Sequence, residues 1–135
     1  MIRSVDDALR FNEQALKLRA QRQAVLASNI AHADTPNFKA VDVDFAQALK
    51  RAVAQQASPG APARTDPAHL GGAQPAGAAA AVRLVERETP MRSADGNTVN
   101  MDRERAEFAA NTLRYEAALR FLHGQIKSLL AALQG

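Results

Sequence analysis

The fold of this chain is decided by the stretch FAANTLRYEAALRFLHGQIKSLLAAL, residues 108–133. Apolar side chains recur along it at alternating spacings of four and three residues, and only Thr112 interrupts them. A repeat of about 3.5 residues keeps one side of a helix against a partner helix, so the stretch predicts coiled-coil pairing. The predicted intramolecular helix seam consists of Phe108, Tyr115, Leu119, Leu122, Ile126, Leu129 and Leu133.

The back of the same predicted helix carries almost no side-chain bulk. Steps of seven residues define a small-residue face, which consists of Ala110, Ala117, Gly124 and Ala131. A glycine in mid-helix costs roughly 1 kcal/mol relative to alanine, which favours a packing reason for Gly124, and a tolerated helix defect is the alternative. We therefore predict that the small-residue face packs against another subunit.

A second long helix is predicted over residues 4–33, with Ser4 as its N-cap and Pro36 forcing the chain out of it. Its apolar residues form two interrupted seams. One seam is Leu9, Leu16, Leu26 and Ile30, and the other is Phe11, Ala15, Leu18 and Val25. Two partial seams favour two packing partners, although a surface helix with irregular patterning fits this segment equally well.

The middle of the chain differs in composition from both ends. Residues 54–81 hold four of the six prolines and four of the seven glycines. They cannot bury enough apolar area to offset an ordering cost of roughly 1–2 kcal/mol per residue, which predicts a disordered connector. The predicted segments are a helix and turn (1–37), a short extended or helical piece (38–53), the connector (54–81), a short extended piece and turn (82–99) and the heptad helix (100–135).

These segments predict an all-α fold class. Two long helices, one at each end of the chain, pair as an antiparallel-type coiled coil, with a disordered or extended segment between them. A pair of helices has little interior, so we expect the chain to be marginally stable alone and to gain stability from neighbours.

Composition argues against most chemical functions. The net charge is only +3 and no basic block is present, which argues against nucleic-acid binding. There is no cysteine, and the three histidines (His32, His69 and His123) lack metal-ligand spacing, so no metal site is predicted. No serine or carboxylate has a base partner at recognisable spacing, and we therefore predict no catalytic residues, no cofactor and no enzymatic activity.

The N-terminal segment MIRSVDDALRFNEQ has acidic residues where a signal peptide would have its apolar core. No apolar run approaches the roughly 20 residues of a membrane span. We expect a soluble chain that has no membrane span and that leaves the cytoplasm, if at all, without a cleaved signal peptide.

The most specific segment is Asn29–Lys39, NIAHADTPNFK. Pro36 fixes its own φ, Asp34 can bond the backbone ahead of it, and Asn37 tolerates the left-handed conformation. These residues predict a strong turn after the first helix, with Phe38 folding back as an anchor, and an ordinary helix C-terminus is the alternative. The residues of this motif are Asn29, Ile30, Ala31, Thr35, Pro36, Asn37 and Phe38.

This motif resembles the end of the N-terminal helix in the bacterial flagellar axial proteins, the rod, hook and hook-associated components, where a pattern like A-x-N-I-A-N-x-x-T-P-G-Y occurs. The chain departs from it with His32 at the second asparagine, Asn37 at the glycine and Phe38 at the tyrosine. Asn37 is the mildest replacement for a left-handed glycine, so the turn should survive. The segments DGNTVNMDRE (95–104) and LRYEA (113–117) make the chain most similar to the proximal rod protein of this family.

The resemblance implies a structural subunit of the flagellar basal-body rod, which crosses the periplasmic space and is needed for motility. It implies export in an unfolded state by the flagellar type III apparatus and side-by-side assembly into a tube. The implied partners are further copies, other rod proteins, the protein at the junction of rod and MS ring, and the export gate. An export signal of the form Phe-x-x-x-apolar fits Phe11 with Ala15 or Leu16, and it fits Phe45 with Leu49 equally well.

Two other functions are consistent with a small helical protein. An export chaperone or adaptor would remain in the cytoplasm, whereas a rod subunit would leave it and stay with basal bodies. A basic DNA-binding protein would lose affinity steeply with rising salt concentration.

Overall fold

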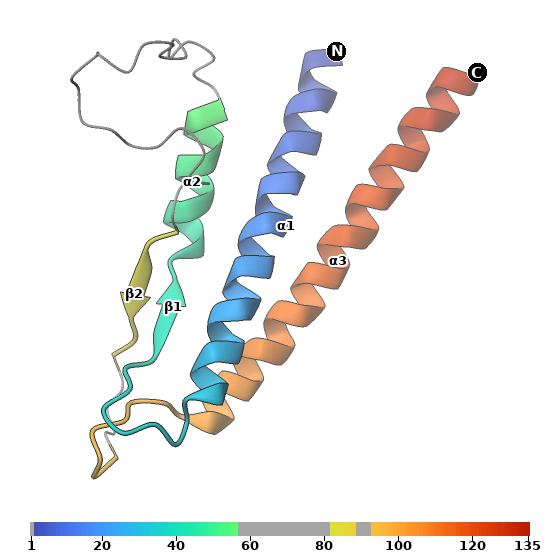
Figure 1. The fold of residues 1–135 in the computed structure, drawn as a ribbon. Coiled ribbons are helices and arrows are strands. Elements are labelled where there is room, and N and C mark those ends of the chain that lie inside the picture. Colours follow the sequence, from blue (N-terminus) through green and yellow to red (C-terminus); the bar gives the residue numbers. More distant parts are fainter. Residues whose placement is uncertain (1, 57–81, 89–92) are drawn as a thin grey trace, which may run out of the picture.

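The computed structural model describes residues 2–56, 82–88 and 93–135. Its elements are α1 (Ile2–Ala31), β1 (Val41–Val43), α2 (Phe45–Gln56), β2 (Leu84–Glu86) and α3 (Met101–Gln134). The long helices α1 and α3 run antiparallel, close together where α1 ends and α3 begins, and they diverge toward the chain termini (Figure 1). The expected all-α fold with two paired terminal helices is confirmed.

The ends of the helices follow local chemistry. Asn100 is the N-cap of α3, and its side-chain oxygen accepts a hydrogen bond from the backbone N–H of Arg103 at 3.1 Å, as helix-capping preference predicts. Asp44 plays the same part before α2, where its carboxylate accepts a hydrogen bond from the backbone N–H of Gln47 at 3.1 Å. The predicted N-cap Ser4 is wrong, because α1 already begins at Ile2.

The middle segments are small. β1 and β2 pair antiparallel, with Val41 opposite Glu86 and Val43 opposite Leu84. Helix α2 continues to Gln56, so residues 54–56, which were assigned to the connector, are helical. Alanine and glutamine are good helix formers, and the first proline comes only at position 59. The rest of the predicted connector, residues 57–81, lies outside the described residues.

Helix α1 has the two packing partners that its two seams predicted. It packs against α3 on one side and against α2 and β1 on another. Leu16, Leu18 and Leu26 are buried in these contacts, and the Arg19 guanidinium lies 4.6 Å from the centre of the Phe45 ring. The alternative of an irregular surface helix does not apply.

The contact between α1 and α3 contains a ladder of polar side chains. The Asn111 amide donates to the Arg19 carbonyl at 2.9 Å and to the Gln23 side chain at 2.6 Å. Gln23 in turn donates to the Thr112 hydroxyl at 2.7 Å, and Asn12 donates to Gln125 at 2.8 Å. We call these residues the polar ladder. Because such partners are lost if either helix slips along the other, the polar ladder defines the register of the pair.

With the polar ladder in place, α3 is rotated about its own axis, so that a different row of residues faces α1 than the predicted seam. The row that includes Asn111 and Gln125 faces α1, whereas Leu119, Ile126 and Leu133 lie to one side with 38%, 40% and 77% of their surface exposed. Phe108, Tyr115 and Leu122 are half-buried, and Leu129 is 38% exposed. The reason lies in α1, whose apolar seam is interrupted by Asn12 and Gln23, and buried polar groups need hydrogen-bonding partners across the contact.

Candidate functional site

The predicted turn after α1 interlocks with the loop before α3. The backbone N–H of Asn37 donates to the Asp95 carbonyl at 3.0 Å, and the N–H of Thr98 donates to the Phe38 carbonyl at 3.0 Å. The Thr98 hydroxyl also accepts a bond from the Ala40 N–H at 2.9 Å. We call these two segments, residues 29–40 and 93–98, the joint. It closes the helical hairpin at the end where α1 and α3 meet (Figure 1).

Two left-handed residues face each other in the joint. Asn37 has φ 59°, as the motif predicted, and Gly96 has φ 80°. A Cβ atom at Gly96 would lie only 2.6 Å from the Asn37 side-chain oxygen, so Gly96 is required by both its backbone conformation and its surroundings.

Asn97 bonds the turn that follows α1 from a distant part of the chain. Its amide nitrogen donates to the carbonyls of His32 at 2.9 Å, Ala33 at 2.9 Å and Thr35 at 2.8 Å. Its oxygen accepts a bond from the Val99 N–H at 2.7 Å, and only 2% of the residue is exposed. These three carbonyls belong to the turn that follows α1, so Asn97 holds this turn from a position about 60 residues along the chain.

Asn29 is the buried member of the predicted motif. It is 0% exposed and bonds Val41 through both backbone groups, donating to the carbonyl at 2.7 Å and accepting from the N–H at 3.2 Å. It also donates to the Glu104 carboxylate at 3.1 Å. Asn29 therefore ties α1 to β1 and α3 at one point.

The other motif residues shape the turn. Ile30 is half-buried, while Ala31, Thr35, Pro36 and Asn37 are exposed. The rings of Phe38 and His32 stack with centroids 4.5 Å apart and an interplanar angle of 6°. His32, which replaces the second asparagine of the family pattern, thus provides the surface on which the predicted anchor Phe38 folds back.

A chain of alternating charges lies beside the joint. Arg22 bonds both carboxylate oxygens of Asp42 at 2.9 Å and reaches Glu107 at 2.9 Å. Arg87 bonds Asp42 and donates to Glu104 at 2.6 Å, and Glu104 is only 1% exposed. We call these five residues the charge cluster. It connects α1, the β1–β2 pair and α3, so each carboxylate that leaves water is matched by a guanidinium.

The charge cluster shifts the pKa of Asp42. Burial by itself would raise it, but the hydrogen bonds from Arg22, Arg87 and the Val43 N–H outweigh burial and lower the pKa of Asp42 from 3.8 to about 2. The same Asp42 hydrogen bond raises the pKa of Arg22, which therefore stays charged. A carboxyl group with a lowered pKa stabilises the fold above its ordinary pKa and loses that contribution as the pH falls toward the folded value.

We expect acid to weaken the fold through Asp42. In the parent chain the free energy of unfolding should fall between about pH 4 and about pH 2, the window set by the two pKa values. Asp42→Asn should lower stability at neutral pH and make the fall in this window shallower. Urea unfolding followed by circular dichroism at several pH values measures this, with the exposed Glu88→Gln as the control. Equal pH dependence in parent and Asp42→Asn would contradict the expectation.

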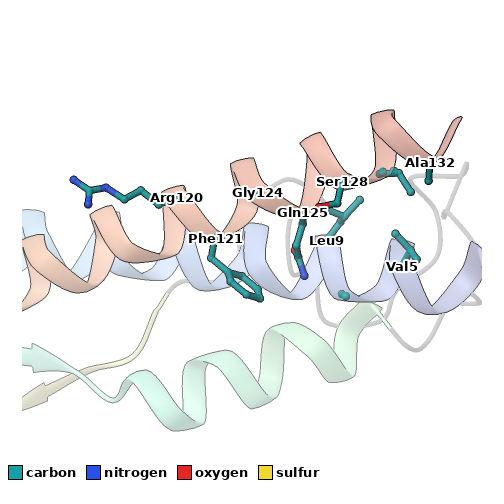
Figure 2. A pocket seen from close by; sticks show the side chains of 10 residues that line it. Val5, Leu9, Arg120, Phe121, Gly124, Gln125, Ser128 and Ala132 are labelled. Carbon is teal, nitrogen blue, oxygen red and sulfur yellow. The ribbon is translucent and has the colours of Figure 1, made fainter. Parts of the chain in front are cut away.

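The opposite end of the hairpin is open and apolar. A hollow of about 720 Å³ lies between the diverging ends of α1 and α3 (Figure 2). We call it the terminal hollow. Its lining includes Val5, Leu9, Phe121, Gly124, Leu129 and Ala132.

The small-residue face is placed near this open end. Ala110 is half-buried, and Ala117, Gly124 and Ala131 are exposed, with Gly124 in the wall of the terminal hollow. Of the two residues predicted as an export signal, Phe11 is 45% exposed and Leu16 is buried. Within the described residues, no group of His, Asp and Glu could hold a metal ion, and no helix is long and apolar enough to cross a membrane.

Local pattern pointed to only part of this arrangement. The turn at Asn37 follows from local residue preferences. Asn97, Arg87 and Glu104 were missed, because each has its partner 17 or more residues away in the sequence. For Asn97 the one local signal was the predicted turn within residues 82–99, which predicts a bend but not what the bend contacts.

Known proteins resemble the chain over nearly its whole length. Residues 9–39 match the family described as flagella basal body rod protein. The chain is 45% identical over 137 residues to the flagellar basal body rod protein FlgB of Salmonella typhimurium, covering 100% of this chain and 99% of that protein. It is 46% identical over 139 residues to FlgB of Escherichia coli K12, with coverage of 99% and 98%. It is 35% identical over 135 residues to FlgB of Buchnera aphidicola, with coverage of 100% of both chains.

The expected resemblance to flagellar rod proteins is thereby confirmed. These relatives are 35–46% identical and cover nearly the whole chain, and therefore the chain belongs to the FlgB family of flagellar basal body rod proteins.

Proposed function

We propose that this chain is a structural, non-catalytic subunit of the flagellar basal-body rod and is needed for motility. The observation that carries the proposal is near-full-length similarity to relatives named as basal body rod proteins. The fold supports it, because the buried polar groups of the joint and of the charge cluster bond one another and hold the two helices in a fixed pair.

Assembly is proposed to occur through the long helices. Large apolar side chains remain exposed toward the C-terminus of α3, among them Phe121, Leu130 and Leu133. Exposed apolar area of this kind favours association, because each Å² of it that a neighbour covers contributes a free energy of about 25 cal/mol. The proposed partners are further copies, other rod proteins and the protein at the junction of rod and MS ring, with the small-residue face as one contact.

Export is proposed to proceed without a cleaved signal peptide, through the flagellar type III apparatus, with the chain unfolded. The polar ladder supports this, because polar contacts between helices contribute less net stability than apolar packing of the same volume. The joint supports it too, because the turn after α1 gains its hydrogen bonds from Asn97 only after the later part of the chain is present.

Fractionation tests the proposal. A strain that lacks its own copy of this protein would express an epitope-tagged version, and basal bodies would be isolated from it. We expect the tagged chain in the basal-body fraction and restored swimming. A chain that restores swimming yet stays in the cytoplasm would instead act as an export chaperone.

Gly124→Leu is expected to separate folding from assembly. A Cβ atom at Gly124 meets nothing within 4 Å, so the single chain can accept a side chain there, and a leucine should raise helix stability by up to about 1 kcal/mol. The added bulk lies on the small-residue face and should abolish swimming. Circular dichroism and a motility assay measure the two effects, with Gly124→Ala as the conservative control. Normal swimming of Gly124→Leu would contradict the proposed packing face.

A further inference from the structure

The two flanks of α3 differ near the open end of the hairpin, and from this difference we propose how two copies of the chain dock. A ridge on one flank of one copy enters the terminal hollow on the other flank of the next copy. The inference rests on the proposed function, because it supplies the surfaces through which the subunits associate.

The flanks are identified by their contacts with α1 and its neighbours. Glu107, which accepts a hydrogen bond from Arg22, marks one flank of α3. Two steps of seven residues from Glu107 reach Phe121, which lines the terminal hollow, so the hollow opens on this flank. Thr112 lies on the opposite flank of α3, where its hydroxyl accepts a hydrogen bond from Gln23. Steps of seven residues from Thr112 reach Leu119, Ile126 and Leu133. We call these three residues the ridge.

The ridge and most of the lining of the terminal hollow are apolar. The ridge is apolar, and its side chains recur every seven residues, about 10.5 Å along the helix axis. Phe121 and Ser128 are also seven residues apart, and together with Val5 and Leu9 of α1 they line the hollow (Figure 2). The absence of a side chain at Gly124 leaves the hollow open between them. An apolar side chain of the ridge of one copy can therefore enter the terminal hollow of another copy, between Phe121 and Ser128.

The charges around the two surfaces indicate that the occupant is a second copy. Arg120 lines the hollow and Arg114 lies on the same flank, whereas Glu116 is next to the ridge. None of these three residues has an ion pair within the described part of the chain. Copies placed side by side in the same orientation bring Glu116 of one toward Arg114 and Arg120 of the next, at nearly the same height along the axis.

Such a contact is heterologous, because it joins different surfaces of identical chains. It does not close on itself as a two-fold dimer does, and it can repeat to form a ring or a helical tube. The arrangement therefore excludes pairing of hollow with hollow or of ridge with ridge.

Two single-cysteine variants test the geometry, since the native chain has no cysteine. Ile126→Cys labels the ridge and Ser128→Cys labels the hollow, and both positions are exposed in the single chain. The two variants are co-expressed, and isolated basal bodies are treated with a short bis-maleimide. We expect a cross-linked dimer with the co-expressed variants and only monomer with either variant alone. A second pair, Leu119→Cys with Gly124→Cys, repeats the test if the first pair does not assemble.

Two results would overturn the inference. One is a basal body that contains both variants of each pair but yields no dimer, and the other is a dimer formed by a single variant alone. A chain that is missing from basal bodies would contradict the proposed function instead. In that case the same cross-linking of mixed, purified full-length variants decides the docking inference alone.

Charge reversal gives an independent readout. Glu116→Arg and Arg120→Glu should each reduce incorporation into basal bodies severalfold, since each places like charges across the contact. The double variant restores the opposite charges of positions 116 and 120 while Arg114 stays, and it should incorporate better than either single variant. A double variant that is no better than the single variants would contradict the charge pairing.

Discussion

Replacing Arg87 with alanine is expected to lower the free energy of unfolding by about 3–5 kcal/mol, the usual cost of breaking a buried ion pair. Arg87 bonds Glu104, which is 1% exposed, and it also bonds Asp42. Without Arg87, Glu104 would remain buried with Asn29 as its hydrogen-bond donor, and a neutral amide cannot replace a guanidinium. The β1–β2 pair and the start of α3 should loosen together, because Arg87, which follows β2, bonds Asp42 of β1 and Glu104 of α3.

Urea unfolding of the full chain, followed by circular dichroism, measures this loss. Arg83→Ala is the matched control, since Arg83 is an exposed arginine just before β2, and its effect should stay within about 0.5 kcal/mol. The double variant Arg87→Ala, Glu104→Leu removes both charges and should recover part of the stability. A loss below about 1 kcal/mol for Arg87→Ala would show that the charge cluster does not hold the elements together.

Asn97→Ala is expected to cost about 2–3 kcal/mol and to open the joint. The substitution removes a donor to the carbonyls of His32, Ala33 and Thr35 in the turn after α1. The His32 and Thr35 carbonyls keep the bonds that they accept from the backbone N–H groups of Thr35 and Phe38. It also removes the acceptor for the Val99 N–H. Because the turn positions α1 relative to α3, swimming should be impaired even under conditions in which the helices persist.

Asn100→Ala is the comparison for this prediction. Asn100 caps α3 through one exposed hydrogen bond, and losing it should cost only about 1 kcal/mol. Urea unfolding measures both variants, and amide hydrogen exchange of residues 32–38 reports opening of the joint. Equal losses for the two asparagines, with unchanged exchange at residues 32–38, would contradict a special role for Asn97.

Local pattern predicted the parts of the fold that depend on neighbouring residues. The two long helices and the left-handed Asn37 each follow from preferences expressed within a few residues. The two seams of α1 correctly favoured two packing partners.

The rotation of α3 could not be predicted from its apolar repeat. Leucines and isoleucine form the more regular stripe, yet Asn111 and Gln125 face α1 because Asn12, Gln23 and the Arg19 carbonyl bond them there. Which face of α3 packs against α1 depends on how the polar groups of the two helices line up with each other. The sequence of either helix alone does not contain this information. Glu104 is a further case, since a glutamate is expected at the surface unless a distant arginine accompanies it into the interior.

The most direct test of the account is a density map of isolated basal bodies assembled with this chain. The map would show whether α1 and α3 of one chain, closed by the joint, form the building block of the rod. We predict antiparallel helix pairs in the rod wall, each pair closed at one end by the turn at residues 29–40 and the loop at residues 93–98. A map in which α1 pairs with α3 of a different copy, or in which the rod contains no such helix pairs, would contradict the claim.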